Sequence, residues 1–257
     1  MAQFNQKVVL EPAYVLHQRP YRDTSLLLEV FSSNHGRLGL VARGVRAKGG
    51  QRRALLQPFT PLSLSWSGRG ELATLTDAEA DPAAHRLVGQ VLLSGFYLNE
   101  LLLHLLHRHD PHPELFAHYR YTLQQLSRVS GADHERRLQV SLRLFEKQLL
   151  QEIGYGLVLD YEVEQGEAID PERLYRFVLG QGPVAARAGA EPGALLFPGS
   201  SLLALAAHRL DQPRVLKDAK RLTRLVLDHY LAGRKLHSRQ LLLDLQRGAE
   251  AAALNKS

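Results

Sequence analysis

The chain contains no cysteine among its 257 residues. It therefore forms no disulfide and offers no thiolate to a metal ion. The lack of cysteine is neutral to mildly favourable for a cytoplasmic location, which we predict together with association with the nucleoid. The N-terminus has no basic segment followed by an uninterrupted apolar run, so no secretory signal is predicted.

Long apolar runs without polar residues are also missing. The segment 87–107 would extend about 31 Å as a helix, but Gln90, Asn99, Glu100 and His104 interrupt it. A carboxylate at the centre of a membrane helix costs about 2.5–3.5 kcal/mol on insertion scales. We therefore predict a helix buried in protein and no membrane span.

The sequence carries none of the short motifs that mark nucleotide or acyl chemistry. There is no G-x-x-x-x-G-K-[ST] phosphate loop, no strand-linked G-x-G-x-x-G and no G-x-S-x-G elbow. The sequence therefore gives no sign of ATP hydrolysis, of dinucleotide chemistry or of hydrolysis by a nucleophilic serine. We predict a protein that is not an enzyme and needs no cofactor.

Acidic residues are absent from the stretch 30–70, which carries seven cations. This stretch alone is +7, whereas the whole chain is +6. A second cationic block, 214–239, is +6, so the other 190 residues sum to −7. Charge segregated in this way attracts polyanions, and a nucleic acid backbone is the expected ligand. Arginines that merely solubilise an exposed loop are the alternative.

The first 80 residues predict a β-barrel. Short alternating or apolar runs are separated by turn residues, as in Ser32–Gly36 and Ser67–Gly70. About five strands in this length fit an OB-type barrel, whose loops hold single strands. The expected strands are 8–16, 25–31, 37–43, 62–66 and 71–76. Aromatic residues that could stack on bases are Tyr14, Tyr21, Phe31, Phe59 and Trp66, with Phe31 and Phe59 assigned to the core.

From residue 82 the apolar spacing becomes helical. Leu138, Leu142, Phe145, Leu149 and Ile153 form one face, and Arg136, Arg143 and Lys147 form another stripe, beside Val140 and Leu144. A cationic stripe edged with apolar groups suits an acidic, hydrophobic peptide. An ordinary solvated helix face explains the pattern equally well.

The second cationic block predicts an amphipathic helix. Its apolar stripe, from Val215 to Tyr230, lies about 160° from a stripe of Arg214, Lys217, Arg221 and Arg224 at 100° per residue. Burial of the first face leaves the second in water, where it can bind phosphates. Between residues 157 and 198 lies a small, irregular insert rich in glycine and proline.

One histidine-rich segment offers an alternative function. His104, His107, His109, Asp110 and His112 could hold a divalent metal, which would allow a nuclease using His107, His109 and Asp110. The same segment also resembles a helix end that runs into a proline-terminated loop. A third interpretation is an RNA-binding OB protein.

Several separated motifs together resemble a known family. They are YVLHQRPYRDTSLLLEVFSSNHGRLGLVARGVRAKGG, LLQPFTPLSLSWSGRGELATLTDAEA, FYLNELLLHLL, LRLFEKQLLQEIGYG and LKDAKRLTRLVLDHYLAGRKLHSRQLL. In these motifs the chain resembles the bacterial DNA repair and recombination mediator family RecO, and in particular its shorter, cysteine-free gamma-proteobacterial members.

The resemblance implies an α+β fold, with an OB-fold domain at residues 1–80 and a mainly helical domain at 81–257. It implies a zinc-ribbon-like insert at about 157–198, metal-free here because the cysteines are missing. It also implies binding of single- and double-stranded DNA, annealing without ATP, recognition of the C-terminal tail of the single-stranded DNA-binding protein SSB, and loading of RecA together with RecR.

Site residues follow from the charge pattern and the resemblance. The expected DNA contacts are Arg37, Arg43, Arg46, Lys48, Arg52, Arg53, Lys217, Lys220, Arg221 and Arg224. The expected SSB-tail contacts are Arg136, Val140, Arg143, Leu144 and Lys147. Arg143, the arginine of the LRLFE motif, resembles a tail-binding residue of the family.

Overall fold

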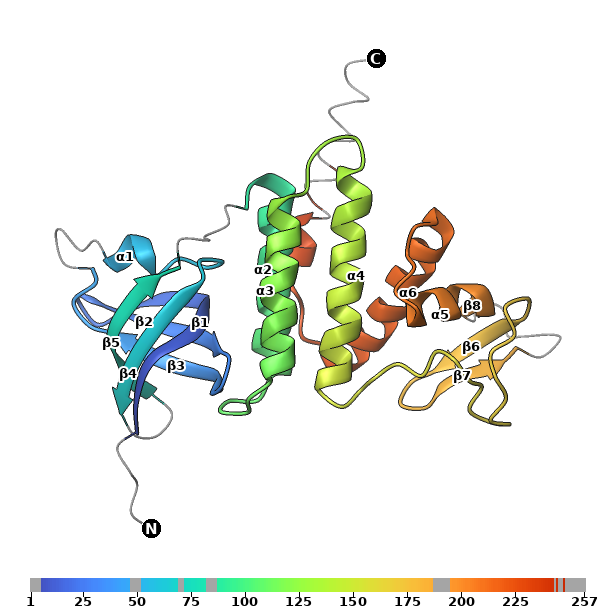
Figure 1. Ribbon diagram of the computed structural model, residues 1–257, viewed down its shortest axis with the longest axis horizontal. Helices are drawn as coiled ribbons and strands as arrows, with labels where there is room; N and C mark the ends of the chain where they lie inside the picture. Colours follow the sequence, from blue (N-terminus) through green and yellow to red (C-terminus); the bar gives the residue numbers. More distant parts are fainter. Residues whose placement is uncertain are drawn as a thin grey trace, which may run out of the picture. The chain divides into compact units, whose positions relative to one another are not determined.

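The computed structural model describes residues 6–46, 52–68, 72–81, 87–186 and 195–242, together with 244 and 247. The chain folds as two compact units (Figure 1). One comprises Met1–Val129 and Lys235–Ser257, and the other comprises Ser130–Arg234. Among the described residues, the first unit thus includes helical segments at 89–105, 113–127 and 237–242 in addition to the barrel. The predicted domain boundary at residue 80 stays a prediction.

A closed five-stranded barrel opens the first unit. Its strand order is β1-β2-β3-β5-β4, with β3 and β5 parallel and the other neighbours antiparallel. This closure removes the exposed sheet edges that promote aggregation. The strands are β1 (Gln6–Tyr21), β2 (Ser25–Ser32), β3 (Gly36–Ala42), β4 (Leu62–Gly68) and β5 (Leu72–Ala80).

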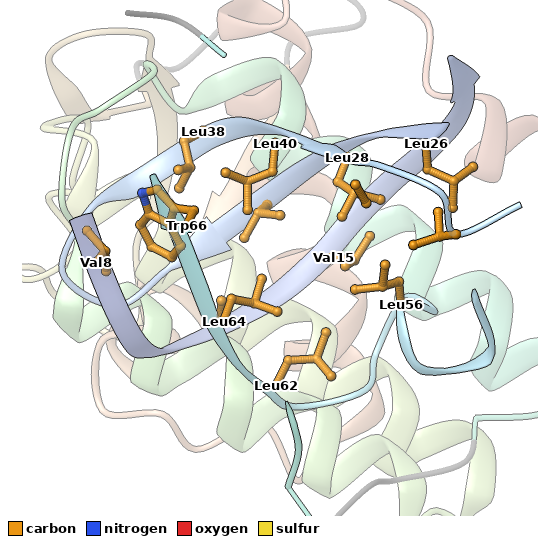
Figure 2. Close-up of a cluster of buried hydrophobic side chains, with 14 residues drawn as sticks. Val8, Val15, Leu26, Leu28, Leu38, Leu40, Leu56, Leu62, Leu64 and Trp66 are labelled. Atoms are coloured by element: carbon orange, nitrogen blue, oxygen red, sulfur yellow. The ribbon is translucent and has the colours of Figure 1, made fainter. Parts of the chain in front are cut away.

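Alternating side chains fill the barrel interior (Figure 2). Leu26, Leu28 and Val30 point inward from β2 because successive strand residues face opposite sides. Leu62, Leu64 and Trp66 do the same from β4. The strand predicted from the alternation at residues 62–66 is thereby confirmed.

The outer face of β1 and β2 is covered by helices α2 (Gly89–Leu105) and α3 (Pro113–Ser127). Tyr14 and Phe31 pack against Phe116 and Tyr119, with ring centroids 5.2–6.1 Å apart. Asn99 on α2 donates to the Leu16 carbonyl at 2.8 Å and accepts from the Tyr119 hydroxyl at 2.5 Å. The barrel and these helices therefore share buried aromatic and polar contacts. The short helix α1 (Arg52–Leu55) lies against β5.

In its described residues, 130–186 and 195–234, the second unit contains three helices and a small sheet. The helices are α4 (His134–Glu152), α5 (Gly199–Ala206) and α6 (Pro213–Tyr230). The predicted apolar faces are confirmed: Leu138, Leu142 and Phe145 are buried on α4, and Val215 and Leu222 are buried on α6. α6 packs against both α4 and α5.

The insert folds as a three-stranded antiparallel sheet in the order β7-β6-β8. Its strands are β6 (Leu174–Val178), β7 (Gly182–Ala185) and β8 (Leu196–Pro198). Tyr175 and Phe197 are buried within it. The carboxylate of buried Glu162 accepts the backbone N–H groups of Glu164 and Gln165 at 3.0 and 2.6 Å. Side-chain packing and this carboxylate hold a loop-rich segment that has no cysteine.

The predicted fold class, an α+β protein with an N-terminal OB-fold barrel followed by a mainly helical region, is confirmed. Within the described ranges, no helix combines the length and the apolar character needed to cross a membrane.

Candidate nucleic-acid interface

Exposed arginines gather around the β1–β2 turn and the segment after β3. We call this set the barrel arginine cluster. Across the described ranges, none of its members forms an ion pair with a carboxylate. Their charge is therefore available to an external anion. The members are Arg19, Arg22, Arg43, Arg46 and Arg53.

Backbone contacts bring these segments together. The backbone N–H of Arg46 donates to the Thr24 carbonyl at 2.8 Å, and its guanidinium donates to the Arg22 carbonyl at 3.3 Å. Gln57 links α1 to β1, because it accepts from Gln18 at 3.1 Å and donates to the Arg53 carbonyl at 2.7 Å. Three segments that are distant in sequence thus contribute to one cationic region.

Arg37 has a different environment from the other described DNA contacts predicted in the barrel. Its guanidinium lies 3.4 Å from the Glu29 carboxylate and donates through Nε to the Leu106 carbonyl at 3.1 Å. The Arg108 guanidinium also contacts Glu29. Arg37 therefore joins the barrel to the α2–α3 loop, and we omit it from the proposed DNA contacts. Lys48 lies outside the described residues, and only the backbone of Arg52 is described.

The predicted cations of α6 differ in their freedom. Lys217 is exposed. Arg224 is paired with Asp228 at 3.6 Å, and both side chains remain about half exposed. Arg221 is paired with Asp218 at 3.2 Å and lies 5.3 Å from the Phe197 ring centroid. Lys217 is consequently the least constrained of these three.

Arg143 is buried instead of exposed on a solvated stripe. It is 5% exposed, and its Nη2 lies 2.5 Å from Oε1 of Glu146, which is 1% exposed. Thr223 on α6 donates to the other Glu146 oxygen at 2.5 Å. The Nε of Arg143 has no hydrogen-bond partner among the described residues. The alternative of an ordinary solvated helix face does not hold at Arg143, because α6 covers this side of α4. The predicted SSB-tail contact of Arg143 stays a prediction.

The Lys220 ammonium interacts electrostatically with the Arg143 guanidinium. Burial lowers the pKa of Lys220, and repulsion from Arg143 lowers it further. Lys220 as a whole residue is exposed. The charged form of its ammonium is nevertheless disfavoured by the local environment. The carboxylates of Glu135 and Glu146 act in the opposite direction and raise the pKa of Lys220.

The other members of the α4 stripe already have partners. Arg136 lies 3.1 Å from Asp133 and 3.5 Å from Asp211. The Lys147 ammonium donates to the carbonyls of Leu205 and Ala206 at 3.1 and 2.8 Å, at the end of α5. This contact suits a cation at a helix C-terminus, and burial lowers the pKa of Lys147. Val140 and Leu144 are half-buried on the same stripe.

The histidine-rich segment begins at His104 in the last turn of α2 and continues through the α2–α3 loop. The backbone N–H of His109 donates to the Arg37 carbonyl at 2.9 Å, and His112 lies 3.4 Å from the Asp110 carboxylate. In the part of the chain that the structure describes, no three His, Asp or Glu side chains are placed to hold a metal ion. The nuclease interpretation thus lacks its ligand set there, and the loop instead packs against the barrel.

Most of the aromatic candidates for base stacking lie inside the protein. Tyr14, Phe31, Phe59 and Trp66 are buried, with exposures of 2%, 0%, 5% and 4%. The assignment of Phe31 and Phe59 to the core is confirmed. Tyr21 alone among these five is partly exposed.

Comparison with known proteins identifies the family. The model described as "Recombination protein O N terminal" matches residues 7–81, and "Recombination protein O C terminal" matches residues 86–240. The chain belongs to the recombination protein O family. The resemblance found in the sequence motifs is thereby confirmed.

Relatives in this family match nearly the whole chain. The DNA repair protein RecO of Methylococcus capsulatus is 51% identical over 235 residues, covering 91% of this chain and 93% of the relative. Those of Nitrosococcus oceani and Coxiella burnetii are 47% and 44% identical, with 94% and 92% of this chain covered and 95% and 99% of the relative.

Two members of the barrel arginine cluster were missed from the sequence. Arg19 and Arg22 precede the acid-free stretch 30–70 and have Asp23 beside them. The signal that could have found them is the strand pairing. Tyr21 pairs with Ser25 at the end of the β1–β2 hairpin, and Leu26 pairs with Ala42 at the end of β3, so the hairpin turn lies beside the segment that follows β3. Charge counted along a window of sequence does not include that spatial neighbour.

Proposed function

We propose that this chain is a recombination mediator that binds DNA and acts without a chemical step of its own. The observation that carries the proposal is the barrel arginine cluster, which is exposed and unpaired within the described part of an OB-type barrel. Such barrels use loop and strand-face residues to bind single strands. Lys217 and Arg224 on α6 supply a second phosphate-binding surface.

Two cationic surfaces on one chain account for annealing. Complementary strands repel each other through their phosphates, and neutralisation by lysine and arginine reduces that repulsion. No nucleotide hydrolysis is required, since the lowered repulsion lets base pairing proceed. We propose that the protein binds both single- and double-stranded DNA for this reason.

Recognition of SSB is proposed at the seam between α4 and α6. The C-terminal tail of SSB would place its acidic groups beside exposed Lys220, while Arg143, which is buried and paired with Glu146, would hold the α4–α6 packing that forms the site. Val140 and Leu144 would contact the apolar end of the tail. Arg136 and Lys147 are weaker candidates because their cationic groups already bind Asp211 and the α5 carbonyls. With RecR, tail binding would direct RecA to SSB-coated strands.

Charge reversal tests the DNA-binding proposal. We expect Arg43→Glu/Arg53→Glu to weaken binding of a fluorescent single strand and to reduce the slope of log K against log salt by about 1.4, two contacts at 0.7 each. Annealing of complementary strands should slow in parallel. Arg120→Glu/Arg128→Glu, which reverses two exposed charges on α3 and at its end, is the matched control. Unchanged affinity and slope in the cluster variant, or an equal loss in the control, would refute the proposal.

A labelled acidic peptide ending in phenylalanine tests the tail site. Lys220→Ala should weaken the peptide complex while leaving single-stranded DNA binding within about twofold. An equal loss of affinity for the peptide and for DNA would contradict separate sites.

Competition between RNA and DNA oligonucleotides of one sequence separates the proposed function from RNA binding, since a DNA mediator should not prefer RNA.

A further inference from the structure

The β1–β2 turn holds an arginine over a tyrosine ring. Tyr21 pairs with Ser25 as the last pair of the hairpin, and Arg22 is the first residue of the turn. The Arg22 guanidinium carbon lies 5.2 Å from the Tyr21 ring centroid. This geometry is within the range of a cation–π contact.

The backbone at this turn is unusual. Arg22 has φ of +50°, a conformation that is uncommon for residues other than glycine. Such a conformation persists only where the surroundings determine it. Here Arg46 contributes two contacts, to the Arg22 carbonyl and to the Thr24 carbonyl. The segment after β3 therefore holds the backbone of the turn that carries Arg22.

Tyr21 is suited to an external planar group. It is the partly exposed member of the five barrel aromatics discussed above, whereas the other four lie in the core or against α2 and α3. Arg19, two residues earlier on β1, faces the same side of the strand. The ring thus lies beside the Arg22 guanidinium and on the same strand face as Arg19.

We propose that Tyr21 and Arg22 form a stacking site for an unpaired nucleobase, while Arg43 and Arg46 hold the adjacent phosphates. This inference rests on the proposed DNA-binding function and adds a base contact to it. Aromatic rings and guanidinium planes both stack on bases regardless of sequence. Bases in a duplex are already stacked on each other, so the site favours single strands over duplexes.

Substitution of Tyr21 gives the decisive measurement. We expect Tyr21→Ala to lower the affinity for an oligothymidine strand on the order of 10-fold, within the range of base–aromatic stacking. Affinity for a blunt duplex should change less than twofold. The salt slope should not change, because no phosphate contact is lost. Tyr21→Phe should bind as the unmodified protein does, since it keeps the ring.

The controls separate stacking from damage to the fold. Tyr121→Ala removes a tyrosine on α3 that is 59% exposed and should leave both affinities unchanged. Arg22→Gly relieves the positive φ, so the unfolding midpoint should be retained or raised while single-strand affinity falls. If Arg22→Gly binds single strands normally, or if Tyr21→Ala weakens single strand and duplex equally, the stacking site is wrong and the Tyr21–Arg22 contact only stabilises the turn.

Failure of this inference can be told apart from failure of the proposed function. If Tyr21→Ala binds single strands normally while Arg43→Glu/Arg53→Glu binds them weakly, the base contact is wrong and phosphate binding by the barrel stands. If both variants bind single strands as the unmodified protein does, DNA binding by the barrel is refuted.

Discussion

Arg143 and Glu146 form an ion pair inside the second unit, one helical turn apart on α4. The two side chains are 6% and 1% exposed, and Thr223 on α6 completes the hydrogen bonding of the carboxylate. A buried pair of this kind adds little net stability compared with apolar residues, but either charge left alone is costly. The pair therefore links the packing of α4 and α6 to the presence of both residues.

We expect Arg143→Ala to lower the free energy of unfolding by about 3–5 kcal/mol, because Glu146 would remain buried without its partner. Urea denaturation measures this directly. The double variant Arg143→Met/Glu146→Leu should lose less than Arg143→Ala alone. A double variant that is the less stable of the two would contradict the account. Tail-peptide binding by Arg143→Ala is informative only if the variant is shown to be folded.

The β2–β3 turn gives a second prediction about stability. Gly36 has φ of +64°, and a Cβ there would lie 2.1 Å from the Asp110 carbonyl oxygen. Gly36→Ala should therefore suffer both backbone strain and a clash, and lose about 3 kcal/mol or more in urea unfolding. Gly44 has φ of +71° with nothing within 4 Å of the added Cβ, so Gly44→Ala should lose only about 1–2 kcal/mol from backbone strain. Equal losses at the two sites would show that the α2–α3 loop yields.

Glu11 should determine part of the acid stability of the barrel. Burial tends to raise its pKa, but hydrogen bonds from Asn34 and Ser32, together with nearby His35, outweigh burial and lower the pKa overall. A carboxyl with a lowered pKa stabilises the fold above its unfolded pKa and loses that contribution as the pH falls through the folded value. Loss should thus begin near pH 4.3, about the ordinary glutamate value, and continue below it.

The matching variant is Glu11→Gln. We expect it to cost about 1–3 kcal/mol at neutral pH, as for a buried donor left without a charged acceptor. Its unfolding free energy should also depend less steeply on pH below the ordinary glutamate pKa. Thermal or urea unfolding between pH 7 and 3 checks both effects. An identical pH dependence in the two proteins would exclude Glu11 as the titrating group.

The fold was largely predictable from the sequence, but which arginines and lysines are exposed without an ion-pair partner was not. Alternation along β4 and the helical spacing on α4 and α6 report burial of local faces, which depends on nearby residues. Arg37 and Arg43 look equivalent in sequence, but strand register brings only Arg37 to Glu29. Arg143 falls on a cationic stripe of α4 and is buried because α6 packs there. Such differences arise from contacts between distant segments.

The insert gives a prediction about a protein without metal-binding cysteines. Glu162 is 5% exposed, and its carboxylate accepts two backbone N–H groups of the following turn. Glu162→Ala should lower the unfolding free energy by about 1.5–3 kcal/mol, the usual value for hydrogen bonds to a charged group. Exposed Glu172 in the same insert is the matched control, and Glu172→Ala should have little effect. Addition of a chelator should leave the unfolding midpoint of the unmodified protein unchanged; a fall would indicate a metal in the fold.

Two neighbouring cations of α6 should respond differently to the same substitution. Lys217 is exposed, so Lys217→Ala should leave stability unchanged and reduce the salt slope for duplex binding by about 0.9, the value for one phosphate contact. Arg221 contacts Asp218 and the Leu196 carbonyl and lies over Phe197, so Arg221→Ala should lower the unfolding free energy by about 1–2 kcal/mol. Salt titrations with a fluorescent duplex, run beside urea unfolding, measure both quantities. If Lys217→Ala leaves the slope unchanged, α6 does not bind duplex phosphates through this residue, and the second DNA surface must be sought elsewhere on the chain.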